Sequence, residues 1–413
     1  MRQPTTPPER GSRQSAASRE HLRKRLVAAA AIVFASSVTG FGGASATSPP
    51  PVTCGQVITE STVLVNDVGP CPGDGVIIGA DDITLDLNGR RIFGTPVRDD
   101  AVGVRLPNRR GVTVTGGEIT GFGAGVVIRA GGANAVKRVW VHDNIGPTDF
   151  PYGEFGDGVF ILRSPDNLLQ GNTIEHNGPY EGIGVFGAES QRNRIVGNVV
   201  KNNNVARYNA ADATYFNLDE GINLGLGIEG SSHTTIADNV IVDNGLNGIN
   251  ACSIRGNPCY TSDNVIVGNL IQGNGFGDPS VPFGYVDIGD GIHVVAIKPP
   301  GRPGSDDFFP PTRNLVARNR VYENAGDGIA IGASNNEIRE NIALRNAQAR
   351  RHFWFDLDDI SLNNDCDSNV WRDNTFGTAF PRCVITGNRA QSTDTAPART
   401  LPPPLDLRRR AAG

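Results

Sequence analysis

The strongest constraint on the fold is a short pattern that recurs from about Asp81 to Asn388. One phrase is an acid followed by Gly and then Ile or Val. The other is Asn-x-Ile/Val-x-x-Asn, as in residues 193–198, 264–269 and 336–341. Together they describe strands of three to five residues, separated by Gly and Asn turns and repeated about every 22 to 27 residues where no insertion intervenes. The acid phrase occurs as Asp157-Gly158-Val159, Glu181-Gly182-Ile183, Glu220-Gly221-Ile222, Asp290-Gly291-Ile292 and Asp327-Gly328-Ile329, with Asn247-Gly248-Ile249 as its amide version.

This repeat predicts a coil of parallel strands rather than a series of hairpins. Successive strands share one pattern and one kind of turn, and two-residue hairpin loops are not repeated between them. A single turn of a coil cannot bury its own apolar face, but stacked turns place Ile over Ile and Asn over Asn. The Asn amide can both donate and accept along such a stack. With 52 Gly and 38% apolar residues, we expect an all-β, single-stranded solenoid of roughly a dozen rungs.

The two phrases resemble the right-handed parallel β-helix repeats of the pectate-lyase-like superfamily, including NosD-like repeats and those of carbohydrate-binding and sugar-hydrolase type. The resemblance implies the fold and leaves the function open, because the superfamily includes polysaccharide lyases, hydrolases, epimerases and adhesins. No catalytic set carries over. The chain has Asp358-Asp359 but lacks the Gly-His-Gly of polygalacturonases, and it has Asp278-Pro279-Ser280 where alginate epimerases have Asp-Pro-His. Copper delivery, linked to the NosD-like branch, favours Met, His and Cys clusters, and the only Met is Met1.

Three segments are expected along the chain. Residues 1–46 contain a basic stretch, an apolar run and a final Ala44-Ser45-Ala46, the order of a cleaved signal peptide. The basic part is long, so a retained anchor or a misplaced start would explain it equally well. Residues 47–390 are expected to form the right-handed parallel β-helix with a cap at each end. Residues 391–413, rich in Pro and Arg, are expected to be a disordered tail.

Charge and hydropathy narrow the partners of the mature chain. Residues 1–46 hold seven of the 38 Lys and Arg and two of the 43 Asp and Glu, so the remainder has a net charge of about −10. This argues against nucleic acid. No later apolar run approaches the length of about 18 residues that a membrane-spanning helix needs. We expect a secreted or extracellular monomer without membrane insertion, attached to the cell envelope or free, whose partner is a polysaccharide.

The six cysteines fall into three close pairs, which favours local disulfides in an oxidising compartment. A zinc site is disfavoured because no Cys-x-x-Cys occurs and the histidines are scattered. The first and third pairs would staple the two caps. The expected pairs are Cys54 with Cys71, Cys252 with Cys259, and Cys366 with Cys383.

The acids of the acid-Gly phrases should line one edge of one sheet. Neighbouring rungs lie about 4.8 Å apart, so carboxylates one or two rungs apart approach the spacings of retaining or inverting glycosidases. Such a row would also suit Ca²⁺, and no other cofactor is indicated. The alternative is favoured for any single acid: Asp before Gly commonly bonds nearby backbone N–H groups in a turn.

Differences between rungs point to a candidate site. If Ile292 faces inward, His293 faces outward, and the equivalent residues include Asn223 and Asn250. These three form a polar outward column beside Glu220 and Asp290. The remaining equivalents are Phe160, Gly184, Ala330 and Ser361. His142, His176 and His233 are interpreted as turn or loop residues.

Insertions at 146–156, 203–219 and 275–289 precede acid-Gly strands and carry aromatic residues. The aromatic residues of these insertions either stack on sugar rings or pack the loops onto the coil. A further insertion at 298–312 supplies Lys298, either a base for β-elimination or part of a plain surface loop. The aromatic residues that we expect to contact the substrate are Tyr208, Tyr215 and Tyr285.

The leading hypothesis is a carbohydrate-acting β-helix that binds, and cleaves or epimerises, an extended polysaccharide containing uronate. His293 or Lys298 would be the base, Asp290 and Glu220 an acid or Ca²⁺ ligands, and Asn223 and Asn250 the groups that orient sugar hydroxyls. The alternative is a non-catalytic extracellular binding or structural module. Whether it is a lyase, a hydrolase or an epimerase is not decided by the sequence.

Overall fold

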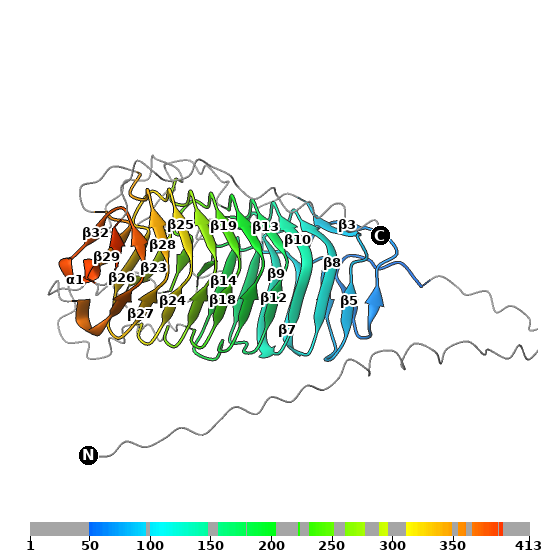
Figure 1. The fold of residues 1–413 in the computed structure, drawn as a ribbon. Coiled ribbons are helices and arrows are strands. Elements are labelled where there is room, and N and C mark those ends of the chain that lie inside the picture. The colour runs from blue at the N-terminus through cyan, green and yellow to red at the C-terminus, as the bar shows by residue number, and fades with distance from the viewer. Residues whose placement is uncertain are drawn as a thin grey trace, which may run out of the picture. The chain divides into compact units, whose positions relative to one another are not determined.

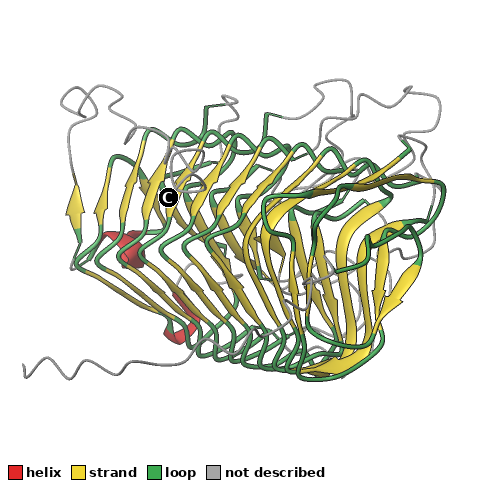
Figure 2. Cartoon of the chain, turned by 90° about the vertical axis from the view of Figure 1, so that its right-hand side faces the viewer, coloured by secondary structure: helices red, strands yellow, loops and turns green. Residues whose placement is uncertain are grey.

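The computed structural model describes residues 49–95, 100–147, 156–178, 180–203, 231–251, 261–276, 289–295, 311–348, 354–360, 366–386 and 388–390, together with the backbone of 222–223. The expected signal peptide 1–46 and tail 391–413 lie outside these residues and stay predictions. The described strands stack as successive turns of one coil, and each full turn contributes a strand to three faces (Figures 1 and 2).

Face 1 is a sheet of twelve strands in which every neighbouring pair is parallel. Parallel pairing of strands consecutive within one sheet requires the chain to pass through the other faces in between. In order, the strands are β1 (Gln56–Ile58), β4 (Val76–Ile78), β7 (Val102–Arg110), β9 (Ala124–Gly132), β11 (Val159–Leu162), β14 (Ile183–Phe186), β17 (Ile222–Asn223), β20 (Ile249–Asn250), β23 (Ile292–Val295), β26 (Ile329–Gly332), β29 (Leu357–Asp359) and β32 (Ala379–Phe380).

Faces 2 and 3 are two further columns of parallel strands, joined because β8 (Thr113–Thr120) and β10 (Ala135–His142) run through both. The other strands of face 2 are β2 (Thr62–Val63), β5 (Thr84–Asp86), β12 (Leu168–Gln170), β15 (Arg194–Val196), β18 (Thr235–Ala237), β21 (Val265–Val267), β24 (Leu315–Ala317), β27 (Glu337–Arg339) and β30 (Val370–Arg372). Those of face 3 are β3 (Val68–Cys71), β6 (Arg91–Gly94), β13 (Thr173–Glu175), β16 (Val199–Lys201), β19 (Val240–Val242), β22 (Leu270–Gln272), β25 (Arg320–Tyr322), β28 (Ile342–Leu344), β31 (Thr375–Phe376) and β33 (Arg389–Ala390).

The core follows from strand alternation. On face 2, the middle residue of each short strand points inward, so Ile195, Ile236 and Ile266 lie in register one above another and are fully buried. Face 1 contributes Ile292 and Val294 in the same way. The predicted stacking of aliphatic residues in an all-β solenoid is therefore confirmed.

Asparagine ladders hold the three corners between faces. At a typical position, Asn269 Oδ1 accepts hydrogen bonds from Asn239 N at 2.9 Å and Asn239 Nδ2 at 3.0 Å, while Asn269 Nδ2 donates to Ile236 O. Wherever the residue preceding one of these asparagines is described, it has positive φ, for example Asp238 at 54°. The three ladders run through 134, 167, 193, 264, 314, 336 and 369; through 172, 198, 239, 269, 319, 341, 374 and 388; and through 144, 177, 203, 244, 274, 324 and 346.

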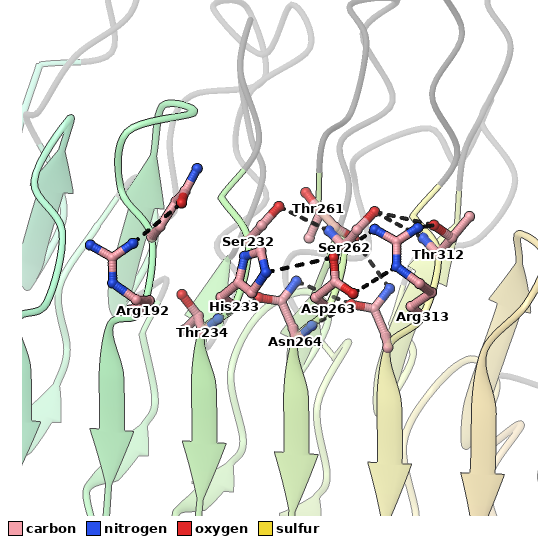
Figure 3. A network of polar contacts seen from close by, with 12 residues as sticks. Arg192, Ser232, His233, Thr234, Thr261, Ser262, Asp263, Asn264, Thr312 and Arg313 are labelled. Atoms are coloured by element: carbon pink, nitrogen blue, oxygen red, sulfur yellow. Dashed lines mark hydrogen bonds and ion pairs between the residues drawn. The ribbon is translucent and has the colours of Figure 1, made fainter.

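The first ladder is interrupted at Thr234, which takes the place of an asparagine beside Asn264 (Figure 3). Across the described residues, neither Asn193 Nδ2 nor Thr234 Oγ1 has a hydrogen-bond partner, although both are buried. Thr234→Asn is expected to restore two amide bonds and to raise the free energy of unfolding by about 1 kcal/mol. Urea denaturation measures this, with Thr235→Asn on the outer surface as the control. An unchanged or lower midpoint for Thr234→Asn would contradict the ladder interpretation.

Both expected caps carry disulfides, Cys54–Cys71 and Cys366–Cys383. Cys252 and Cys259 lie outside the described residues. At the C-terminal end, the short helix α1 (Arg382–Ile385) follows β32 and buries Val384. The 3₁₀ turn η1 (Cys366–Ser368) precedes β30. Within the described part of the chain no helix is long and apolar enough to cross a membrane.

Candidate functional site

The acids before the strands of face 1 form a ladder, as expected, in which Asp157, Asp290 and Asp327 each bond the rung that follows. Asp157 Oδ1 accepts from Glu181 N at 2.7 Å, and Asp290 Oδ1 accepts from Asp327 N at 2.6 Å. Asp327 Oδ1 in turn accepts from Phe355 N. The side chains are almost fully buried. This geometry gives the ladder acids the structural role that their position before glycine favoured.

Asp290 differs from the other described ladder acids because it also holds a histidine. Its Oδ2 lies 2.7 Å from His293 Nδ1, three residues along the chain. Both side chains are buried, with 0% and 1% exposed. A carboxylate at Nδ1 makes that nitrogen the donor and leaves Nε2 as the nitrogen available to a ligand. No described residue is hydrogen-bonded to Nε2. The Asp290 carboxylate thus contacts both His293 Nδ1 and the backbone of the next rung, and its expected role as an acid or Ca²⁺ ligand stays a prediction.

His293 faces outward from the core, as predicted. Ile292 and Val294 belong to the hydrophobic core, whereas His293 between them does not. It lies in register with Asn250 on one side and Ala330 on the other, and Asn250 is in register with Asn223. Register therefore places the three polar residues in one outward column. Asn250 and His293 are both withdrawn from solvent, with 3% and 1% of the residue exposed.

The sequence placed one member of this column wrongly. The residue in register with Ala330 is Asp358, and Ser361 lies outside the described residues. Asp358 is 7% exposed and faces outward between Leu357 and Asp359. Asp359 points the other way and accepts hydrogen bonds from Trp371 Nε1 at 2.8 Å and Asn369 Nδ2 at 3.0 Å. Alternation from Leu357 would have found Asp358, but β29 lacks the acid-Gly phrase that marks the other strands.

At its N-terminal end the same column becomes apolar. Phe160 is in register with Val127 and Gly184, and its ring lies 5.1 Å from that of Phe186. A Cβ at Gly184 would lie 2.4 Å from Phe186 Cε2, so the Phe186 ring covers this position. The outward column thus changes from aromatic residues through amides to His293 and Asp358.

Several expected site residues cannot be placed. Glu220, Lys298, Tyr208, Tyr215 and Tyr285 all lie outside the described residues, and Asn223 is described by its backbone alone. Most of the insertions 203–219 and 275–289 lie outside as well. In the part of the chain that is described, no three His, Cys, Asp or Glu side chains form a group that could hold a metal ion.

Of the three other histidines among the described residues, two are turn residues, as expected: His176 and His233 have φ of 56° and 57°. His233 is exposed and lies 3.8 Å from Asp263, which pairs with Arg313 (Figure 3). The prediction for His142 is wrong. It ends strand β10, and the turn residue is the following Asp143, because the alternating pattern of β10 continues through His142.

His142 belongs to a cluster outside face 3. Its ring stacks on Trp140 with the centroids 3.9 Å apart. Glu175 accepts from Trp140 Nε1 at 2.7 Å and lies 2.7 Å from Lys201 Nζ. Burial alone would raise the pKa of Glu175, but the hydrogen bond and charge of Lys201, aided by Trp140, hold that pKa below its usual range. The cluster ties together β10, β13 and β16.

Glu175→Gln should destabilise the protein in a pH-dependent way. A lowered folded-state pKa contributes stability that is fully present above the unfolded pKa of about 4.3 and is lost as pH falls through the folded pKa. The variant should lose about 1–3 kcal/mol of unfolding free energy near neutral pH. Urea denaturation near neutral pH and at about pH 3.5 should show this difference shrinking in acid. A difference that is the same at both pH values would contradict the ion-pair interpretation.

The comparisons with known proteins agree with this architecture. Residues 74–257 match the family described as "Right handed beta helix region". The described residues form a right-handed parallel β-helix. No curated protein matches the sequence of this β-helix.

Solved structures similar to this β-helix carry several kinds of name. The Dettilon tailspike protein is 17% identical over 82% of this chain and 58% of its own, with a TM-score of 0.46. The alginate lyase from Paenibacillus sp. is 16% identical over 72% of this chain and 95% of its own, with a TM-score of 0.43. PfbA, a surface adhesin of Streptococcus pneumoniae, is 10% identical over 68% and 61%, with a TM-score of 0.38. The aligned part is little more than half of the tailspike chain, and at these identities the likeness concerns the fold alone.

Proposed function

We propose that this β-helix binds an extended polysaccharide across face 1 and carries out acid–base chemistry on it with His293. The observation that supports this most is the Asp290–His293 pair. A buried carboxylate that fixes the tautomer of an outward-facing imidazole is an arrangement suited to proton transfer at Nε2. Asp290 Oδ1 makes the same kind of backbone hydrogen bond as Asp157 Oδ1 and Asp327 Oδ1, so the contact of its Oδ2 with His293 is additional to the ladder.

The composition of the outward column supports a carbohydrate ligand. Aromatic rings stack on the apolar faces of sugars, while amides and carboxylates bond hydroxyl groups. In this proposal Phe186 lies at the apolar end, Asn223 and Asn250 orient hydroxyl groups, and Asp358 lies at the other end. Tyr208, Tyr215 and Tyr285 are proposed as further stacking residues, with Glu220 as a polar contact and Lys298 as the alternative base.

The spacing of His293 and Asp358 supports a proposal of hydrolysis. They are two rungs apart, or about 9.6 Å along the coil, close to the 6.5–9.5 Å between acid and base in inverting glycosidases. In this reaction Asp358 would protonate the leaving oxygen as the C–O bond breaks, while His293 takes a proton from the attacking water. Elimination from a uronate would need a base for the C5 proton, a group that neutralises the uronate carboxylate and a proton for the leaving oxygen as the C4–O bond breaks.

The test uses purified protein and a panel of pectin, alginate, hyaluronan, xylan and neutral glucans, each with and without Ca²⁺. Unsaturated-uronate absorbance and new reducing ends are followed together. Reducing ends without absorbance are expected. Unsaturated-uronate absorbance would indicate elimination instead of hydrolysis, with His293 or Lys298 as the base. No binding to any polymer would reject the carbohydrate proposal.

One observation favours a second candidate, a non-catalytic binding module. The ladder carboxylates of Asp157, Asp290 and Asp327 each accept a backbone hydrogen bond from the next rung, as expected of a purely structural row. Polymer binding without any product would support this candidate. So would Asp290→Ala and His293→Ala variants that bind like the wild type, the first with reduced stability.

We also propose that the protein works outside the cytoplasm. The support is the pair of cap disulfides, because such bonds persist in oxidising compartments. Fractionation followed by N-terminal sequencing of the mature chain tests this proposal, with cleavage after Ala46 as the expected result.

A further inference from the structure

The outer side of face 2 is apolar between β18 and β24. In these strands the middle residue points into the core, yet the outward residues are also mostly apolar. We call this surface the outer patch. Parallel sheets normally have both faces covered, and contiguous apolar patches on soluble proteins commonly mark interaction sites. The outer patch consists of the half-buried residues Thr235, Ala237, Val265, Val267 and Leu315, together with Ala317, which is fully buried.

Two sets of charges that flank the outer patch lie at symmetric positions and have opposite sign, whereas the corner next to face 1 carries the His233–Asp263–Arg313 group. Asp238 and Arg318 lie one rung before and one rung after Gly268, and both are exposed turn residues with positive φ. In the outward column through Val265, Arg194 lies two rungs before and Glu337 two rungs after. Within the described residues, Arg194, Asp238 and Arg318 form no ion pair. Glu337 contacts Arg339 and Arg372.

This arrangement is complementary to itself. We propose that two copies of the chain pack outer patch against outer patch, about a two-fold axis that lies in the interface at the β21 rung and runs along the strand. The axis brings each residue before β21 opposite the residue equally far after it in the second copy. Asp238 then faces Arg318 and Arg194 faces Glu337, each pair occurring twice. Val265 and Val267 face their own copies at the centre. At the corner next to face 1, Asp263 also faces its own copy, with its charge compensated by Arg313 of the same copy at 2.7 Å, and His233 faces Arg313.

The size of the surface sets the expected strength. From Arg194 to Glu337 the patch spans four rung steps, about 19 Å. The area of such a patch is smaller than the area of about 800 Å² per partner that a standard interface buries. The dimer should therefore be weak, with a Kd on the order of tens of micromolar. Salt should weaken it further, because the flanking charge pairs lie at the surface. This revises the expectation of a monomer and does not depend on the proposed function.

Sedimentation equilibrium of the mature chain from about 1 to 200 µM tests the proposal. Val267→Glu places two carboxylates face to face and should leave a monomer at all concentrations. Asp238→Arg should weaken the dimer at least tenfold, and Asp238→Arg combined with Arg318→Asp should recover it. Thr84→Glu is the control, an exposed substitution on the same face outside the outer patch. Thermal midpoints confirm that each variant is folded.

Three results would overturn the proposal. One is a wild-type protein that stays monomeric throughout this range. Another is a charge-reversed pair that does not recover the dimer. The third is a wild-type monomer that dimerises once residues 391–413 are removed, because the chain's own tail would then be the occupant of the outer patch.

Discussion

His293→Gln is expected to lower turnover by about 10²–10⁴-fold on whichever polymer the panel identifies, with little change in KM. Glutamine keeps the polar character and much of the volume of the side chain but cannot exchange a proton near neutral pH. The protein should stay folded, because His293 faces away from the core and its described hydrogen bond is to Asp290 alone. Initial rates and polymer binding measured on the same preparation separate lost chemistry from lost affinity. Full activity in His293→Gln would indicate that Lys298, rather than His293, is the base.

Asp290→Asn and Asp327→Asn form a matched pair that isolates the positioning role. Asn247 already occupies the ladder and accepts from Asp290 N at 2.8 Å and Gly289 N at 2.9 Å, so an amide can serve there. Both variants should therefore lose little stability. Only Asp290→Asn places a donor against His293 Nδ1, which favours the wrong tautomer, so only it should lose turnover, by about 10²-fold or more, with an altered pH profile. Equal activity in the two variants would mean that Asp290 has only the structural role of the other ladder acids.

The fold could be predicted from the sequence because short local patterns specify its strands and corners and recur along the chain. Alternating Val and Ile define the inward residues, and an Asn after each left-handed residue defines a corner. Both signals recur in nearly every rung. The register of Asn250 with His293 followed from the same alternation. The two cap disulfides followed from cysteine spacing, since each pair lies 17 residues apart.

The site was harder to predict because it depends on departures from the repeat. Asp358 was displaced by three positions because β29 lacks the glycine that fixed the alignment elsewhere. The bond between Asp290 and His293 depends on how a strand residue folds back toward the turn before it, which strand alternation does not specify. The pattern also showed that His293 faces outward without showing that it is buried. Non-repeating insertions carry no periodic signal at all.

The glycine of the acid-Gly phrase is set by contact between rungs, which predicts a large effect for Gly248→Ala. A Cβ there would lie 2.6 Å from Ile271 Cγ2, 2.7 Å from Gly291 O and 2.9 Å from Asn274 Nδ2. The carbonyl and the ladder amide are fixed by their own hydrogen bonds, so the two rungs must separate locally. We expect a loss of at least about 3 kcal/mol of unfolding free energy, at the upper end of overpacking effects. Urea denaturation measures it against Gly73→Ala, where a new Cβ meets nothing within 4 Å and φ is not positive. Similar midpoints for the two variants would mean that the rungs adjust more readily than their spacing indicates.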